Sequence, residues 1–417
     1  MSSTTPDVIP SARELLKQRD YLFFWVSRWC GAFGAQVQSV ALGWYMYSLA
    51  RRTMSVAEAA FMVGMIGLAA FIPVLLLTLP AGEAADRHDR RRVSLCCLAG
   101  ELTTAFVLTL AAWRGFATPA LLLGVAAAFG ACRAFFAPAS AALGPMLVPR
   151  PLLPRSIAWN SLAWQTASIA GPAAAGLLVA LSPAHAFVTA LILYAVSGAC
   201  IAAIRGNTKP APQPGSRLEL VKEGLAYVWR SKTVLGAISL DLFAVLLGGA
   251  TALLPVFARD VLHVGPGGFG LLRAAPAVGA TAIAFWLAAN PIRSRAGAYM
   301  FGGVALFGVA TCVFALSKVM WLSVAALAVL GGADMLSVYV RQTLIQLVTP
   351  DHMRGRVAAV STVFIGASNE LGEFESGVVA RFLGPVGAAL FGGVGALAVT
   401  GIWAWLFPDL RKADEMA

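Results

Sequence analysis

Apolar runs of about twenty residues recur along the whole chain, and no other feature restricts its fold as strongly. A helix of that length spans the hydrocarbon core of a bilayer, since each residue adds about 1.5 Å. The sequence predicts twelve spans, at roughly 21–49, 56–79, 93–113, 118–140, 156–181, 185–204, 233–258, 267–289, 297–316, 319–341, 357–379 and 384–407. The expected fold is therefore an all-α membrane protein with twelve transmembrane helices.

The charge distribution agrees with this fold and orients it. Only 12% of the residues are charged and the mean hydropathy is +0.77, whereas soluble proteins carry about 25% charged residues. Most of the 31 Lys and Arg residues lie on the side of the two termini, which places both termini in the cytoplasm. The net charge of +11 then faces anionic lipid headgroups, and no nucleic-acid partner is expected.

The two halves of the sequence repeat at an offset of 201 residues. Segment 150–178 aligns with segment 351–379, so that Gly176 meets Gly377. Six spans followed by six in the same orientation form a parallel repeat about an axis normal to the membrane, as in major facilitator transporters, whose central site lies between the halves. We expect an N-terminal six-helix bundle at 1–204, a cytoplasmic linker with an amphipathic helix at 205–232, and a C-terminal six-helix bundle at 233–417.

The loop GEAADRHDRRRV, residues 82–93, resembles the pattern G-x-x-x-D-R-x-G-R-R of the major facilitator superfamily. The matching residues are Gly82, Asp86, Arg87, Arg90 and Arg91, while Asp89 replaces the usual glycine. We expect Asp86 to face the positive N-terminal end of a neighbouring helix and the arginines to bind acidic groups and headgroups. Such a loop would latch the cytoplasmic side in one conformation. The alternative is a basic loop that only follows the positive-inside rule.

Further segments make the resemblance more specific. FFWVSRWCGAFG, LVPRPLLPRSIAWNSL, EGLAYVWRS and TPDHMRGRV are similar to segments of a bacterial branch of the superfamily that includes enterobactin-type siderophore exporters and macrolide-efflux proteins. The resemblance covers nearly the whole chain. It implies two pseudo-symmetric six-helix bundles and secondary active export, usually coupled to protons, but it does not define the substrate.

Ionisable residues inside the expected spans mark functional positions, because a charge in hydrocarbon is costly. Arg133 and Asp334 are related by the 201-residue offset, and Arg28 and Asp241 lie at similar depths, about 10–12 Å from the cytoplasmic end. In each pair the residue of the first half is cationic and its counterpart is anionic. This predicts two ion pairs that close the cytoplasmic side between the halves. The alternative is that each charge pairs within its own half.

GASNELGEFESGVV, residues 366–379, places three glutamates in an expected span. Glu370 and Glu373 are three residues apart and share a helix face, whereas Glu375 points elsewhere, near the outer interface, and is expected to be solvated. The first two lie roughly 20–24 Å from the cytoplasmic end, in the outer half of the membrane. Two carboxylates this close in a low dielectric are not expected to be ionised together.

Such a pair suits proton carriage. We therefore expect Glu373, assisted by Glu370, to carry the coupling proton, with Asp241 and Asp334 as further candidates. The resemblance supports this, because enterobactin-type exporters place an acidic residue after a glycine at the position of Glu373. The alternative is that Glu370 and Glu373 only form a hydrogen-bonded contact between helices.

Aromatic and polar residues on spans expected to line the cavity suit an amphipathic organic ligand. These candidate ligand residues are Arg28, Trp25, Trp29, Arg133, Phe136, Asn160, Gln165 and Asn369. Most Trp and Phe residues of membrane proteins instead contact lipid or pack, so no pattern names a substrate. The six Cys residues lie in apolar segments without a CxxC pair, and the four His residues lie in loops or at segment ends. No metal or other cofactor is expected.

We expect a proton-driven exporter of an amphipathic organic compound, such as a drug or a siderophore, in the bacterial inner membrane. Its partners would be a small-molecule substrate, protons and membrane lipids, and we expect a monomer. A second hypothesis is import or exchange of a polar or anionic nutrient or a metal chelate. A third is a membrane receptor or enzyme that does not transport. No catalytic motif or soluble domain in the sequence favours the third hypothesis.

Overall fold

The computed structural model describes residues 12–209, 217–292 and 294–411. Its first half, residues 12–204, is helical and is called the N half below. The N half contains α1 (Ala12–Leu16), α2 (Arg19–Ala50), α3 (Val56–Arg87), α4 (Arg90–Arg114), α5 (Pro119–Leu143), η1 (Gly144–Leu147), η2 (Arg150–Leu152), α6 (Leu153–Leu181) and α7 (Pro183–Ala203).

The second half, residues 233–411, is called the C half and follows the linker helix α8 (Arg217–Arg230). Its elements are α9 (Lys232–Leu247), η3 (Ala250–Leu253), α10 (Leu254–Val256), η4 (Phe257–Val261), α11 (Gly265–Ala289), α12 (Ala296–Leu316), α13 (Met320–Val348), α14 (Asp351–Leu406) and α15 (Pro408–Arg411). The helix α14 is broken at Gly384, whose φ of 72° is in the left-handed region that glycine adopts at little cost. Pro385 follows at once, so α14 forms two successive spans.

The number of spans agrees with the expected twelve. Within the described ranges, ten helices are long and apolar enough to cross a membrane, and α14 is counted among them once. Its break adds one span, and α2, with 32 residues, is long enough to add another. The expected span 233–258 is interrupted, because α9 ends before Gly248 and Gly249, and short segments carry the chain on to Val261.

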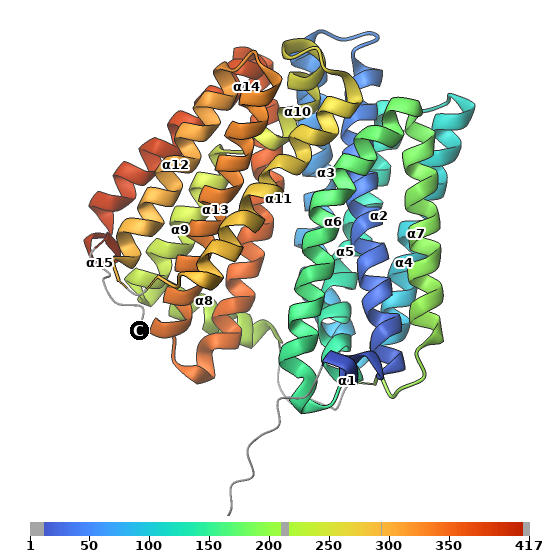
Figure 1. The fold of residues 1–417 in the computed structure, drawn as a ribbon, viewed down its shortest axis with the longest axis vertical. Coiled ribbons are helices and arrows are strands. Elements are labelled where there is room, and N and C mark those ends of the chain that lie inside the picture. The colour runs from blue at the N-terminus through green and yellow to red at the C-terminus, as the bar shows by residue number, and fades with distance from the viewer. Residues whose placement is uncertain (1–11, 210–216, 293, 412–417) are drawn as a thin grey trace, which may run out of the picture.

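The helices form two bundles that lie side by side (Figure 1). Helices α2 to α7 form the N-half bundle, and α9 and α11 to α14 form the C-half bundle. The halves contact each other mainly along two seams, where α3 packs against α14 and α6 packs against α11. These four helices therefore determine how the halves can move against each other.

Glycines bring the backbones of the two halves into contact at both seams. A Cβ atom at Gly64 would lie 2.7 Å from the Cα atom of Gly377, and one at Gly176 would lie 2.6 Å from that of Gly270. Real Cβ atoms do not approach other atoms so closely, so both seams require glycine. Gly176 and Gly377 are the residues that the sequence repeat superimposes, and each seam uses the same position of the repeat.

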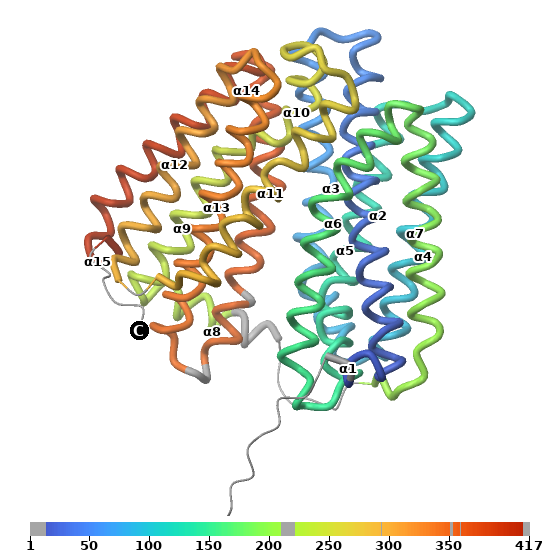
Figure 2. The backbone as a smooth tube through the Cα atoms, viewed as in Figure 1, coloured from blue at the N-terminus to red at the C-terminus, as the bar shows by residue number. Residues whose placement is uncertain are grey.

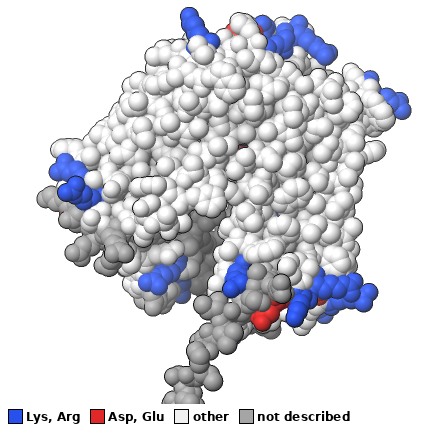
Figure 3. Space-filling model, viewed as in Figure 1, with Lys and Arg blue, Asp and Glu red and all other residues white. Residues whose placement is uncertain are grey.

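The two halves are close together on the side away from the chain ends and separate towards the side where these ends lie (Figure 2). We call these the outer side and the inner side. The space-filling view shows a recess between the halves on the inner side (Figure 3). Lys and Arg residues gather along both rims of this view, and the band between them shows few charges, as expected for a surface that faces lipid.

The linker helix α8 lies on the inner side and is attached to the C half. Glu223 forms an ion pair with Arg356 at the start of α14, at 2.5 Å, and the hydroxyl of Tyr227 donates to the carbonyl oxygen of Val348 at 3.2 Å. The Trp229 side chain remains 66% exposed. The Pro-rich part of the expected linker, at 210–216, lies outside the described residues.

Candidate functional site

The expected carboxylate pair lies where the two halves meet. Glu373 on α14 forms an ion pair with Arg273 on α11, at 3.6 Å, and these side chains are 28% and 27% exposed. Arg273 also donates to the carbonyl oxygen of Thr251 in η3 at 3.2 Å. Three elements of the C half therefore hold the Glu373 carboxylate in place.

Glu370 lies one helical turn before Glu373 and is influenced by both halves. The guanidinium groups of Arg133 on α5 and of Arg273 attract its carboxylate, and the carboxylate of Glu373 repels it. On α3, a Cβ atom at Gly67 would lie 2.8 Å from the carbonyl oxygen of Glu370 and 2.9 Å from the Cβ of Glu373. The pair is thus covered by α3 of the N half.

The cations around this pair come from different halves. Arg273 belongs to the C half together with Glu373, so a rigid movement of one half leaves that ion pair intact. Arg133 belongs to the N half, and its distance from Glu370 must change when the halves move. The charge balance of the pair therefore depends on the conformation of the protein.

Glu375 points away from this pair, as its spacing predicts. It is half-buried, however, and it accepts a hydrogen bond from the hydroxyl of Ser376 at 3.4 Å. The expectation that Glu375 is simply solvated is therefore wrong. Small residues on α14, Gly372 and Ser376, let this helix pack closely against the end of α9 and against η3.

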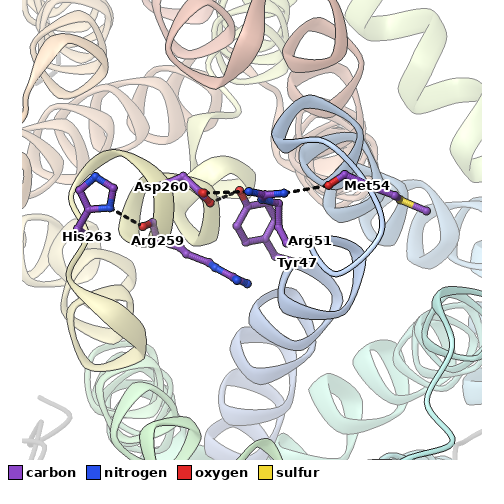
Figure 4. Close-up of polar contacts among 6 residues, drawn as sticks. All are labelled: Tyr47, Arg51, Met54, Arg259, Asp260 and His263. Atoms are coloured by element: carbon purple, nitrogen blue, oxygen red, sulfur yellow. Dashed lines mark hydrogen bonds and ion pairs between the residues drawn. The ribbon is translucent and has the colours of Figure 1, made fainter.

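A second polar cluster, the outer latch, joins the halves on the outer side (Figure 4). It consists of Tyr47 and Arg51 at the end of α2 and Asp260 on η4. Asp260 accepts a hydrogen bond from the Tyr47 hydroxyl and lies 3.5 Å from Arg51. The segment η4 is a π-helical turn, a form often found at functional sites. It directs Asp260 towards α2 across the boundary between the halves.

Local contacts fix the orientation of the latch residues (Figure 4). Arg51 also donates to the carbonyl oxygen of Met54 at 2.9 Å, and Arg259 places its guanidinium 5.9 Å from the centre of the Tyr47 ring. The ring of His263 lies 3.0 Å from the carbonyl oxygen of Arg259. The latch therefore combines an ion pair, a charged hydrogen bond and a cation–π contact.

In this structure Arg28 and Asp241 do not form the ion pair that was expected to close the inner side between the halves. Asp241 on α9 pairs with Arg341 on α13 inside the C half, and the two side chains are only 9% and 2% exposed. Arg28 donates to the hydroxyl of Ser140 on α5 at 3.2 Å, inside the N half. Asp241 points towards α13 because a buried guanidinium is available there, and pairing within each half is the arrangement that holds.

These two contacts are equivalent under the repeat. Ser140 and Arg341 are 201 residues apart, as are Arg133 and Asp334. In each half, the first transmembrane helix directs a charged side chain against the same position of the fourth. The repeat thus predicts the positions but not the partners, since the cation lies on the first helix in the N half and on the fourth in the C half.

The expected pair of Arg133 and Asp334 is also not among the ion pairs of the described residues. Arg133 lies over the ring of Phe129, at 5.8 Å from its centre. Asp334 lines a small cavity inside the C half, together with Asp241 and Ser337. The pair was expected to close the inner side, whereas in this structure a recess lies between the halves on that side (Figure 3).

The tryptophans expected to bind ligand join α2 to α6. The indole of Trp25 donates to the carbonyl oxygen of Trp159 at 2.8 Å, and the two rings meet edge to face at 5.5 Å. The indole of Trp29 donates to the hydroxyl of Thr166 at 3.1 Å. The indole N–H groups of Trp25 and Trp29 are therefore hydrogen-bonded within the N half, so these residues can contact a ligand only through their ring surfaces.

The other expected ligand residues are spread over several helices. Asn160 lies 3.5 Å from the Tyr21 hydroxyl, and Phe136 packs against the apolar core of the N half. Gln165 donates to the hydroxyl of Thr281 across the α6–α11 seam at 2.6 Å. Asn369 is exposed and donates to the carbonyl oxygen of Ile365 on its own helix. Gln165 is therefore a seam residue.

The arginines of the motif loop cap helix ends. Arg90 donates to the carbonyl oxygen of Ala142 at 3.1 Å, near the end of α5, and Arg91 donates to those of Ile201 and Ala202 at the end of α7. Cations are favourable there because the carbonyl end of a helix is negative. These two arginines thus bind helix ends of the N half rather than acidic groups. In the same motif, Arg87 pairs with Glu83 at 2.7 Å, Gly82 is buried and Asp86 is half-buried.

Asp89, the residue that departs from the family pattern, caps α4. Its carboxylate accepts hydrogen bonds from the backbone N–H of Arg91 at 3.0 Å and the hydroxyl of Thr208 at 2.6 Å. Burial by itself raises the pKa of Asp89, but these hydrogen bonds outweigh it and hold the pKa below its usual value. Asp89 therefore ties the loop to the segment that follows α7.

Sequence reasoning counted Arg273 among the charges inside the spans but gave it no role, and it did not identify Arg341 or the outer latch as site residues. Arg341 was assigned to the cytoplasmic end of the expected span 319–341, whereas α13 continues to Val348 and buries it. A signal was present, since Asp334 and Arg341 are seven residues apart and share a helix face. The latch left no comparable pattern, because its residues come from two helical elements more than two hundred residues apart in the sequence.

Two helical bundles, repeated in sequence and joined at glycine-lined seams with charged groups between them, define a major facilitator transporter. Comparison with known families agrees. The chain belongs to the transmembrane secretion effector family, whose model matches residues 11–417. The expected superfamily, fold and transport activity are confirmed, and the protein is a transporter and not an enzyme.

The chain is similar over most of its length to exporters. It is 30% identical over 403 residues to the multidrug efflux pump Tap of Mycobacterium tuberculosis, and this alignment covers 92% of each chain. It is 25% identical over 385 residues to the enterobactin exporter EntS of Citrobacter koseri, and this alignment covers 86% of each chain. The expected resemblance to siderophore exporters is confirmed.

Solved structures show the same fold. The POT family transporter PepTSo superimposes with a TM-score of 0.74 at 12% identity, and the match covers 94% of this chain and 98% of that one. A bacterial homologue of the lysosomal transporter Spinster, in an inward-facing and occupied conformation, superimposes with a TM-score of 0.72 at 13% identity, covering 96% of each chain. At these identities the likeness concerns the fold alone.

Proposed function

We propose that this protein exports an amphipathic organic compound across the bacterial inner membrane in exchange for protons, by alternating access. The similarity to a multidrug efflux pump and to an enterobactin exporter supports a substrate of this class. With cytoplasmic termini, as the charge distribution predicts, the present structure is the inward-facing state. Its closed outer side and open inner side fit the stage at which substrate enters from the cytoplasm.

The observation that carries this proposal is the carboxylate pair at the seam between the halves. In the inward-facing state the guanidinium groups of Arg133 and Arg273 both attract the carboxylate of Glu370, and Arg273 also pairs with Glu373. When the outer side opens, α3 and α5 move away together with the N half. Arg133 then withdraws from Glu370, and one carboxylate of the pair is left without a counter-cation.

A proton from the outside restores the balance. Glu373 stays bound to Arg273 within the C half, so Glu370 is the member of the pair that takes up the proton. The sequence-based expectation assigned this role to Glu373 with help from Glu370, and the ion pair reverses their parts in our proposal. Closing the outer side brings Arg133 back, favours the ionised form of Glu370 and releases the proton inwards.

The substrate side of the cycle involves the inner recess. Ring surfaces of Trp25 and Trp29 on α2 suit flat apolar groups, and exposed Arg133 suits an acidic or polar group. Because Arg133 also faces Glu370, a substrate that binds Arg133 would weaken its hold on that carboxylate. Substrate binding to Arg133 and proton binding to Glu370 would then affect each other, as the exchange of substrate for protons requires.

Transport in reconstituted vesicles tests this function. Purified protein would be placed in vesicles with an imposed pH gradient, and uptake of ethidium, a flat amphipathic cation, and of an iron–catecholate chelate would be measured. We expect the wild type to accumulate at least one of them when the gradient is present. Glu370→Gln should abolish accumulation driven by the pH gradient, while substrate binding and the exchange of substrate down its own concentration gradient persist.

Glu375→Gln is the matched control, because it removes a half-buried glutamate from the same helix but away from the pair. It should retain gradient-driven accumulation. Accumulation by Glu370→Gln at the wild-type level would refute the assignment of the proton to this residue. Accumulation that follows the membrane potential but not the pH gradient would refute proton exchange altogether.

A further inference from the structure

Three ionisable residues, called the inner triad below, lie inside the C half away from the seam. They are Asp241 on α9 and Asp334 and Arg341 on α13. Asp241 and Arg341 form a nearly buried ion pair. Asp334 and Arg341 are seven residues apart on one helix face, and Asp334 shares a small cavity with Asp241 and Ser337. That cavity has room for about one water molecule.

The charges of the inner triad do not cancel. Asp241 and Asp334 line one cavity, and only Asp241 has a cation as its partner, so full ionisation leaves one negative charge inside a helical bundle. Among the described residues, the neighbouring helices supply no second cation at this depth, since the arginines of α14 lie near the ends of its first span, Arg354 and Arg356 at the inner end and Arg381 at the outer end. Helix α12 carries no charged residue, its other titratable groups being Tyr299 and Cys312, and the only charged residue of α11, Arg273, pairs with Glu373. Besides Asp241, α9 carries only Lys232, at its inner end.

Unpartnered polar atoms beside the ion pair are a second, independent observation. The Nε of Arg341 and the hydroxyl of Ser361 are buried without a hydrogen-bond partner among the described residues. Both residues line a narrow cavity that also includes Asp241. Two cavities thus meet at the Asp241 carboxylate, and polar groups line each of them. A purely structural ion pair would leave fewer hydrogen bonds unmade, because a buried polar atom without a partner is unfavourable.

We propose that the inner triad is a second proton-binding site, separate from the pair at the seam, and that Asp334 holds the proton. An uncompensated carboxylate inside a membrane protein is far more stable in its neutral form. Protonation of Asp334 leaves the pair of Asp241 and Arg341 neutral as a whole. The site then carries no net charge.

The depths of the three residues, measured from the inner side, indicate the path along which a proton would leave the site. Counted from the inner ends of their helices, Arg341 lies about 10 Å deep, Asp241 about 14 Å and Asp334 about 21 Å. Release would pass the proton from Asp334 to Asp241, so that the O–H bond of one carboxyl breaks as that of the other forms. Asp241 would then pass it to water on the inner side, and no electrons are exchanged.

This site deepens the proposed proton exchange but does not rely on the same residues. It predicts that more than one proton is bound per protein molecule, whichever residue acts at the seam. Because all three residues belong to the C half, movement of the halves does not separate them. The inner triad would therefore set how many protons are carried, whereas the pair at the seam would sense which side is open.

The test is a proton titration of the purified protein in sodium-free detergent solution, with no substrate present. The number of protons released between acidic and alkaline pH would be compared for the wild type, Asp334→Asn, Glu370→Gln and the double variant. We expect Asp334→Asn to lose about one proton from the range around neutral pH, and the double variant to lose about one more than either single variant. Asp409→Asn, which removes an exposed carboxyl outside the spans, is the matched control.

The outcomes separate the two proposals. If Asp334→Asn titrates like Asp409→Asn, Asp334 is ionised in the folded protein and the second site is refuted. If only Glu370→Gln behaves like Asp409→Asn, the second site stands and the role of Glu370 falls. The titration would be repeated with added sodium chloride. If sodium ions displace the proton that depends on Asp334, the site binds cations in general and the proposal is overturned.

Folding is checked by thermal unfolding of each variant. Asp334→Asn keeps the shape of the side chain and resembles its protonated form, so it should be about as stable as the wild type. If it does not fold, the infrared absorption of protonated carboxyl groups in Glu370→Gln provides the second measurement. A protonated carboxyl must remain visible at neutral pH in that protein, and its absence would refute the site.

Discussion

Asp260 is the residue through which the outer latch can be broken with the least change in shape. Its carboxylate accepts the hydrogen bond from Tyr47 and pairs with Arg51 at 3.5 Å. Asp260→Asn keeps the size of the side chain and removes its charge. Both partners lie in the N half, so the substitution weakens the outward closure without removing a contact inside either bundle.

The size of the effect follows from these contacts. A hydrogen bond to a charged group contributes about 1.5–3 kcal/mol, and an ion pair that is about a quarter exposed adds less than about 1 kcal/mol. Asparagine keeps a weaker, neutral hydrogen bond to Tyr47. The closed outer side should therefore lose about 2 kcal/mol, which corresponds to a shift of roughly 30-fold towards the outward-open state.

Chemical labelling of a buried cysteine measures this shift. Ala60 on α3 is fully buried at the outer seam, and its carbonyl oxygen lies close to Gly377 of the other half. In a variant without native cysteines, Ala60→Cys should react with a membrane-impermeant maleimide only when the outer side opens. When opening and closing are fast compared with the labelling reaction, the labelling rate follows the population of the open state. Under that condition Asp260→Asn should raise the labelling rate by roughly 30-fold.

The controls follow from the same geometry. Arg114→Gln removes an exposed arginine at the end of α4 and should leave the rate unchanged. Tyr47→Phe should raise the rate on its own but add little to Asp260→Asn, since both remove the same hydrogen bond. Additive effects of the two substitutions, or an unchanged rate in Asp260→Asn, would show that the latch does not hold the halves together.

Two further predictions concern the seam and the motif loop. Gly64→Ala places a Cβ atom 2.7 Å from the backbone of Gly377 and should destabilise the closed outer seam by about 1–3 kcal/mol. The expected result is faster labelling at Ala60→Cys. The control Gly366→Ala lies on α14 with open space around it and should leave the labelling rate unchanged. Asp89→Ala should lower the stability by about 1 kcal/mol, because it removes the cap of α4. Since the folded pKa of Asp89 is depressed, its contribution is complete above the unfolded pKa and is lost as the pH falls through the folded value, so thermal unfolding of the two proteins should converge at acidic pH.

The sequence predicted the fold because its information is local and periodic. Each span is visible as an apolar run, and the repeat relates the two halves, down to the glycines that form the seams. The carboxylate pair of Glu370 and Glu373 was also predictable, since both residues lie on one helix and their spacing fixes their shared face.

Ion-pair partners could not be predicted in the same way. Asp241 has two possible cations at similar depth, Arg28 across the cavity and Arg341 within its own half, and only the rotation of α9 decides between them. The outer latch depends on a π-helical turn that directs Asp260 towards Tyr47. Neither rotation nor such a turn leaves a periodic signal in the sequence.

The central claim is that the charge of Glu370 couples proton binding to the opening of the outer side. The most direct test is the distance between spin labels on the outer surface of the two halves, at Thr53→Cys and Lys318→Cys, which are both exposed. In the wild type this distance should increase as the pH is lowered, because protonation of Glu370 removes its attraction to Arg133. Glu370→Gln should show the longer distance at every pH. A wild-type distance that does not respond to pH, or a full response that persists in Glu370→Gln, would contradict the account.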